Sequence, residues 1–157
     1  MRVGLLAQGV YPSEVCRRIE GIAPVLSLKA RLTAIQELEP GDTVGYGMRW
    51  RAEHSCRIGV LSIGYGDGYP RLRNQGHALL HGRRVPLVGG VTMDALMIDL
   101  SSVPEARIGD EAVLLGTQGS DCIPVQELAR LSNTVTYDVL AGLRGRLPRV
   151  CRGGASS

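Results

Sequence analysis

The stretch that decides the fold is residues 77–88, which read HALLHGRRVPLV. Two short apolar runs flank a turn that contains Gly82, and this pattern is typical of a β-hairpin. Pro86 cannot donate a hydrogen bond to a neighbouring strand, so its strand is expected at an edge or at a bulge. His81, next to Gly82, is therefore interpreted as a turn residue rather than a metal ligand.

Further short strands are predicted on both sides of this hairpin. Residues 57–63, 95–100 and 111–115 are apolar and partly β-branched, and turn residues separate them at short intervals. This spacing favours a closed or nearly closed barrel. Two short helices are expected near the C-terminus, over 124–132 and 136–143, because apolar residues recur there at helical spacing.

The composition excludes several classes of protein. Of the 157 residues, 44% are hydrophobic and 21% charged, which is ordinary for a globular domain. No run approaches the roughly 18 apolar residues of a transmembrane helix, so no membrane partner is expected. The net charge of +3 is scattered and the aromatic residues lie away from the arginine clusters, which argues against nucleic acid. The four cysteines are too widely spaced for a zinc site, and they are interpreted as reduced thiols in a cytoplasm.

Three tyrosines stand in glycine-rich runs, Tyr46 within 44–49 and Tyr65 and Tyr69 within 63–71. Glycine favours turns and gives a neighbouring ring nothing to pack against. Such tyrosines are therefore expected to project their hydroxyls from loops, where functional groups gather. The alternative is structural, with each hydroxyl fixing a barrel corner through one backbone hydrogen bond. The residues alone leave both interpretations open.

Two features point beyond this chain. Residues 2–12 look like the last strand of another unit, so we expect that further sequence precedes residue 1. Lys29 is the only lysine, against seventeen arginines. Chemistry that needs a lysine amine must use Lys29 or a lysine of another chain.

Seven runs, read in order, resemble the C-terminal part of the alanine racemase family. They are 2–5, 27–30, 40–47, 63–71, 86–94, 133–137 and 147–150, and together they cover nearly the whole chain. Any single run is a weak signal, whereas the ordered set is specific. Members of this family have an α/β barrel that holds pyridoxal 5′-phosphate (PLP) on a lysine. A mainly β domain follows it and completes the active site of the partner subunit in a homodimer.

The resemblance implies a fold, a domain division and a function. The expected fold class is mainly β, a Greek-key-like β-barrel with one or two short helices near the C-terminus. Residues 1–12 would be the remnant of the last strand of the α/β barrel, and residues 13–157 the β-barrel domain. The implied activity is interconversion of L- and D-alanine for cell-wall precursors in the bacterial cytoplasm. Lys29 does not match the cofactor lysine of the family, so the chain alone is expected to be inactive.

The resemblance also implies roles on the substrate side of the site. Tyr46 corresponds to the acid/base tyrosine that serves the partner subunit. Tyr65 corresponds to a gate tyrosine at the mouth of the site and Arg71 to an arginine of the entrance corridor. Met93 corresponds to the residue whose backbone N–H meets the substrate carboxylate, while Asp94 is interpreted as a local structural acceptor.

On the cofactor side, the resemblance implies three residues and shows two departures. Arg2 corresponds to the arginine that bonds the pyridine nitrogen of PLP. Gly4 and Leu5 correspond to backbone donors for its phosphate. Gly90 stands where many members carry an entrance arginine, and Gly145 where some carry a phosphate-binding tyrosine.

Three functions remain open from the sequence. The first is a partial enzyme, the C-terminal part of a PLP-dependent racemase acting on alanine, serine or another small amino acid. The second is a stand-alone, non-catalytic β-barrel that binds a partner. The third is an arginine-rich barrel that binds nucleic acid. A lysine-bearing barrel encoded upstream of residue 1 would favour the first function over the second.

Overall fold

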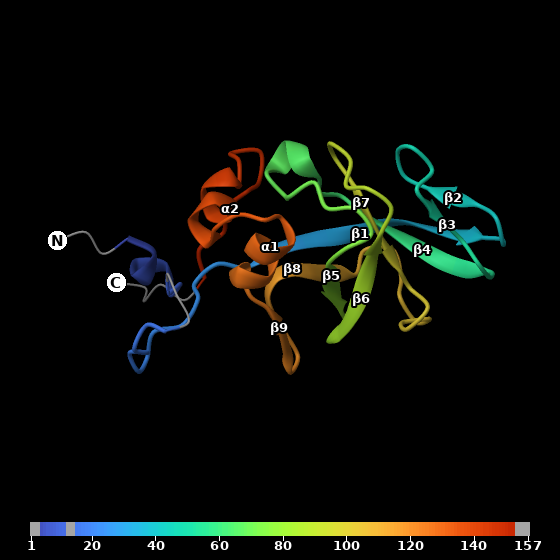
Figure 1. Cartoon of the computed structure of the whole chain (residues 1–157). Helices are drawn as coiled ribbons and strands as arrows, with labels where there is room; N and C mark the ends of the chain where they lie inside the picture. The colour runs from blue at the N-terminus through green and yellow to red at the C-terminus, as the bar shows by residue number, and fades with distance from the viewer. Residues whose placement is uncertain (1–3, 12–14, 153–157) are drawn as a thin grey trace.

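A computed structural model describes residues 4–11 and 15–152. Six antiparallel strands close into a barrel, in the order β1-β4-β7-β6-β5-β8, with β8 pairing back onto β1 (Figure 1). A short strand, β9, extends β8 outside this ring, and β2 and β3 form a separate ribbon. The predicted mainly β barrel is confirmed. The strands are β1 (Leu28–Leu38), β2 (Thr43–Val44), β3 (Trp50–Arg51), β4 (Cys56–Leu61), β5 (His77–Leu80), β6 (Arg83–Val88), β7 (Leu96–Asp99), β8 (Glu111–Gln118) and β9 (Asp121–Ile123).

The predicted hairpin forms the β5–β6 pair. His81 and Gly82 make its turn, and both have positive φ, 52° and 75°. Positive φ at both central residues is what a tight hairpin needs to match the twist of its strands. Because β4 lies beside β7, the spatial order β4-β7-β6-β5 is that of a Greek key. β6 lies between β5 and β7 and pairs without a register shift, so the expectation that Pro86 marks an edge strand or a bulge is wrong. Pro86 pairs with His77 and precedes the residues of β6 that pair with β7.

The long strand β1 closes the barrel. Its first half pairs with β8 and its second half with β4, with a register shift between Leu32 and Ala34. Leu28, Ala30 and Leu32 point into the core while the residues between them are exposed. A shift of this kind bends a strand, so one strand reaches both neighbours.

Two helices, α1 (Val125–Leu131) and α2 (Thr136–Gly142), cover one end of the barrel (Figure 1). Leu128 and Val139 belong to the same apolar core as Leu32 and Leu80 of the barrel. Both helices lie where the sequence predicts them. No helix in the described part of the chain combines the length and apolar character needed to cross a membrane.

The N-terminal segment differs from its prediction. Gly4–Gln8 form a short 3-10 helix, η1, where a strand was expected. A 3-10 turn needs only local hydrogen bonds, for example from Gly9 N–H to the Leu6 carbonyl at 3.0 Å, whereas a strand needs a neighbour. Residues 1–3 and 12–14 lie outside the described residues. The assignment of residues 1–12 to the end of another barrel stays a prediction.

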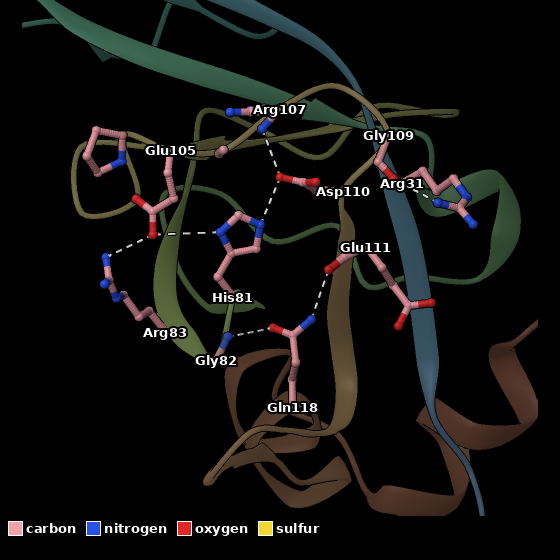
Figure 2. A network of polar contacts seen from close by, with 12 residues as sticks. Arg31, His81, Gly82, Arg83, Glu105, Arg107, Gly109, Asp110, Glu111 and Gln118 are labelled. Atoms are coloured by element: carbon pink, nitrogen blue, oxygen red, sulfur yellow. Dashed lines mark hydrogen bonds and ion pairs between the residues drawn. The ribbon is translucent and has the colours of Figure 1, made fainter.

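A polar network holds the β5–β6 turn against the loop before β8 (Figure 2). His81 Nε2 lies 2.8 Å from Asp110 Oδ2, and its Nδ1 lies 3.7 Å from Glu105 Oε1. Asp110 Oδ2 also accepts the Arg107 N–H at 2.8 Å. This bond, with the nearby His81, holds the pKa of Asp110 below its ordinary value.

This network predicts an acid-sensitive part of the stability. A carboxylate whose pKa is lowered by folding stabilises the fold above its unfolded pKa of about 4, and that contribution is lost as pH falls through the folded value. Asp110→Asn is therefore expected to cost about 1 kcal/mol at pH 7. The difference from the unmodified chain should shrink below about pH 4. Urea unfolding at pH 7 and pH 3 measures both values, and an equal difference at the two pH values would contradict the prediction.

Candidate functional site

Three loops converge along one side of the barrel, the upper side in Figure 1. They are residues 45–49 between β2 and β3, residues 64–71 with the 3-10 helix η2 (Tyr65–Asp67), and residues 89–95 between β6 and β7. The Tyr65 N–H donates to the Thr92 carbonyl at 2.9 Å, and the Gly66 N–H to the Met93 carbonyl at 2.8 Å. The runs that carry Tyr65 and Met93 are therefore bonded directly to each other.

Tyr46 projects from the first loop. It stands between Gly45 and Gly47, which both have a φ of 76°, the left-handed region that suits glycine. Its side chain is 74% exposed. Within the described residues its hydroxyl makes no hydrogen bond, which favours the functional over the structural interpretation of this tyrosine. A Cβ on Gly45 would stand 3.0 Å from the Gly90 nitrogen, so the loop packs closely on the 89–95 loop.

Asn74, for which the sequence predicted no role, joins the loop of residues 45–49 to the loop of residues 89–95 by hydrogen bonds. Its side-chain Oδ1 accepts the Gly89 N–H at 2.7 Å, and its backbone N–H donates to the Gly89 carbonyl at 2.9 Å. Its Nδ2 donates to the Arg49 carbonyl at 3.2 Å. One side chain thus joins the loop of Tyr46 to the 89–95 loop.

The structure brings Tyr65 and Arg71 together. The Arg71 guanidinium lies 5.0 Å from the centre of the Tyr65 ring, within the range of a cation–π contact. Arg71 is exposed and Tyr65 is half-buried. A gate tyrosine and an entrance arginine would share a surface in this way.

Tyr69 behaves differently from the other two tyrosines, so the expectation that it projects from a loop is wrong. It is 1% exposed and belongs to the barrel core. Gly68, with a φ of 99°, reverses the chain after η2 and directs the next residue inward. The Tyr69 hydroxyl has no hydrogen-bond partner among the described residues, and burial raises the pKa of Tyr69 above its ordinary value.

Met93 offers a free backbone donor. Its carbonyl accepts the Gly66 N–H, but its own N–H has no acceptor in the part of the chain that the structure describes. The residue is 50% exposed. A backbone N–H without a partner suits a carboxylate ligand.

Arg146 connects this loop to η2. Its Nη2 donates to Asp94 Oδ1 at 2.6 Å, and its Nε lies 3.4 Å from Asp67 Oδ1. Asp67 is 7% exposed and also accepts the Gly64 N–H at 3.0 Å. The hydrogen bond to Asp94 and the charge of Asp67 raise the pKa of Arg146. Asp94 is thus the local acceptor that was expected.

The proposed cofactor residues that the structure describes lie apart from these loops. Arg2 is outside the described residues. Gly4 and Leu5 begin η1, and Figure 1 shows η1 at the opposite end of the chain from the loop of Tyr46, beyond α2. Lys29 lies on β1, where its Nζ bonds Glu111 Oε1 at 2.6 Å. The structure therefore places Tyr46, Tyr65, Arg71 and Met93 on loops that meet at residues 89–95, and separates these loops from Gly4 and Leu5.

Metal chemistry finds no support in this geometry. Within residues 4–11 and 15–152, no group of three or more His, Cys, Asp or Glu side chains is arranged to hold a metal ion. The four cysteines are free thiols. The polar groups that the candidate site offers are those of Tyr46, Tyr65 and Arg71 and the backbone N–H of Met93.

Comparison with known proteins gives this site a context. The family profile described as alanine racemase, C-terminal domain, matches residues 25–151. The chain belongs to the alanine racemase family. The alanine racemase of Methylacidiphilum infernorum is 41% identical over 150 residues, which are 95% of this chain and 38% of that protein. The alanine racemase of Nostoc is 42% identical over 151 residues, 96% of this chain and 39% of that protein. The chain thus spans about two-fifths of the length of these relatives.

Solved alanine racemases share the fold. The enzyme from Bacillus anthracis with bound L-Ala-P superposes with a TM-score of 0.88 at 34% identity, over 94% of this chain and 38% of that one. The biosynthetic enzyme from Pseudomonas aeruginosa gives a TM-score of 0.84 at 41% identity, over 94% and 40%. The enzyme from Bartonella henselae, with covalently bound pyridoxal phosphate, gives 0.83 at 26% identity, over 94% and 40%.

Proposed function

We propose that this chain is the C-terminal part of a PLP-dependent alanine racemase and supplies the acid/base Tyr46 to the active site of a partner subunit. The observation that carries the proposal is the exposed Tyr46, held between two left-handed glycines on loops shared with the free N–H of Met93. Related enzymes have been solved with L-Ala-P and with covalently bound pyridoxal phosphate.

Racemisation removes the Cα proton from one face of the amino acid and returns a proton to the other face. The cofactor supplies the electron sink that makes this proton removable. The protein must supply one acid/base group on each face. Tyr46 exchanges a proton at its hydroxyl on one face. The Met93 N–H binds the substrate carboxylate, and Tyr65 and Arg71 line the approach.

The residues of this chain fit the cofactor only in part. Gly4 and Leu5 begin η1, where the first backbone N–H groups lack acceptors within the helix and suit a phosphate. Arg2 would bond the pyridine nitrogen. Lys29 does not match the cofactor lysine of the family and its amine bonds Glu111, so the proposal places the cofactor lysine in a barrel domain outside this chain.

The positions of η1 and the Tyr46 loop support a homodimer. If Gly4 and Leu5 hold the cofactor of one subunit, the loop between β2 and β3 that carries Tyr46 lies at the other end of the same chain (Figure 1). A second copy must then provide the tyrosine. Residues 1–12 would end the barrel domain and residues 13–157 would form the β domain. The enzyme would supply D-alanine for peptidoglycan precursors in the cytoplasm.

A reconstituted enzyme tests this function. We expect this chain with PLP alone to give neither bound cofactor nor racemisation. Joined to the barrel domain of the Pseudomonas aeruginosa enzyme, which is 41% identical in the matched region, it should convert L-alanine to D-alanine. Chiral chromatography of the product and the visible spectrum of the bound cofactor measure both results.

The control is the same barrel rejoined to its own C-terminal domain. A hybrid that binds PLP and forms dimers but does not racemise alanine would favour a non-catalytic binding module instead. Conversion of serine faster than alanine would keep the racemase function and change its substrate.

A further inference from the structure

We propose that Arg146 is a positioning residue, which fixes the Met93 N–H so that it can bind the substrate carboxylate. This inference rests on the proposed function and adds to it a residue from the C-terminal segment, outside the three loops. Arg146 touches neither substrate nor cofactor in this role, because it acts through Asp94 and η2.

The two peptide groups on either side of Met93 are both bonded to η2. The peptide group that carries the Met93 N–H also carries the Thr92 carbonyl, which accepts the Tyr65 N–H at 2.9 Å. The following peptide group carries the Met93 carbonyl, which accepts the Gly66 N–H at 2.8 Å. Both groups are therefore oriented by η2, and the direction of the free N–H depends on where η2 lies.

Arg146, which lies outside the three loops, links η2 to the loop of residues 89–95. Arg146 bonds Asp94, the residue directly after Met93, and pairs with Asp67 in η2. The Arg144 N–H adds a bond to the Asp67 carbonyl at 2.9 Å, so the segment that carries Arg146 is itself anchored on η2. Arg146 thus links the buried carboxylate of Asp67 to the exposed carboxylate of Asp94.

The ion pairs of Arg146 with Asp67 and with Asp94 differ in how much they stabilise the fold, and they therefore have different roles. The Asp67 side chain is 10% exposed, so its charge needs a partner, and removing that partner is costly. The Asp94 side chain is 63% exposed, and an exposed pair adds little stability. The bond to Asp94 therefore serves mainly to orient the loop. Three contacts from η2 and Arg146 therefore hold the loop that carries the Met93 N–H.

A donor fixed in advance binds an anion without the cost of ordering the loop. Loss of Arg146 should therefore weaken binding of the carboxylate more than it slows proton transfer. We expect Arg146→Gln, in the hybrid racemase described above, to raise KM for alanine about tenfold with kcat changed less than about twofold. Asp94→Asn should act in the same direction and less strongly, since Asp67 keeps its partner.

The experiment measures KM and kcat for alanine, the inhibition constant of propionate and the melting temperature. Propionate carries the carboxylate of alanine without its amino group, so it probes the carboxylate site alone. Arg130→Gln is the matched control, since Arg130 is exposed on α1 and its side chain makes no hydrogen bond or ion pair within the described residues. The double variant of Arg146 and Asp94 should be no weaker in propionate binding than Arg146→Gln, because both changes break the same link.

The outcomes separate this inference from the proposed function. If the unmodified hybrid does not racemise alanine, the proposed function fails. If it does, and Arg146→Gln matches Arg130→Gln in KM and in propionate inhibition, the positioning role is wrong. A lower melting temperature and kcat with unchanged KM would overturn it too, by showing a purely structural role.

Discussion

Tyr46→Phe is expected to lower kcat/KM for racemisation about 10²- to 10⁴-fold in both directions, in the hybrid racemase that carries this chain. Phenylalanine keeps the ring of this exposed side chain and removes the hydroxyl that exchanges the proton. Because L- and D-alanine have equal free energy, the two directions must lose kcat/KM equally. The loss therefore cannot show by itself which face Tyr46 serves.

Exchange of the Cα proton with solvent identifies that face. In D₂O the base on the opposite face still removes its proton from one enantiomer and returns deuterium to the same side. We therefore expect one enantiomer of alanine to keep exchanging in the Tyr46→Phe variant, without inversion. Proton NMR of the Cα signal measures this exchange for each enantiomer separately.

Tyr65→Phe is the comparison variant. Its hydroxyl is assigned to the mouth of the site, so its loss should change KM more than kcat and leave exchange from both enantiomers. Racemisation near the unmodified rate in Tyr46→Phe would remove Tyr46 from the reaction. Equal loss of exchange from both enantiomers would indicate a damaged site instead.

Much of the barrel follows from local sequence patterns. The β5–β6 hairpin could be predicted because Gly82 marks a turn between two apolar runs, and both turn residues adopt the positive φ that a tight hairpin needs. Strands β7 and β8 and both helices also follow from apolar spacing. The longest strand, β1, was not predicted, although Leu28, Ala30 and Leu32 alternate as a half-buried strand should. The bulge after Leu32 breaks that alternation and shortens the signal.

The site was harder to predict than the fold, since it depends on contacts between distant segments. The glycines around Tyr65 predicted a loop there, but they gave no reason to separate Tyr69, which enters the core. Asp67 lay within a quoted run and received no role, because its partner Arg146 lies far along the chain. A buried carboxylate needs a cation or several hydrogen-bond donors as partners. This rule could point to a partner such as Arg146 only once the structure showed that Asp67 is buried.

Gly68→Ala is expected to destabilise the chain by about 3 kcal/mol, which lowers the melting temperature by about 10 °C for a domain of this size. Gly68 has a φ of 99°, which strains any other residue. An added Cβ would also overlap the Gly142 carbonyl oxygen and stand 2.8 Å from the Leu143 Cα. These atoms belong to backbone at the end of α2, so they cannot move aside as a flexible side chain would.

Gly109→Ala separates these two causes. Gly109 has nearly the same φ, 97°, and a Cβ there would meet nothing within 4 Å. This variant should therefore cost only about 1 kcal/mol, the strain of the backbone alone. The difference between the two melting temperatures measures how firmly η2 is held against the end of α2. Because the segment after α2 also carries Arg146, a large difference would mean that the loops of Tyr65 and Met93 depend on this close approach, and equal melting temperatures would show that they do not.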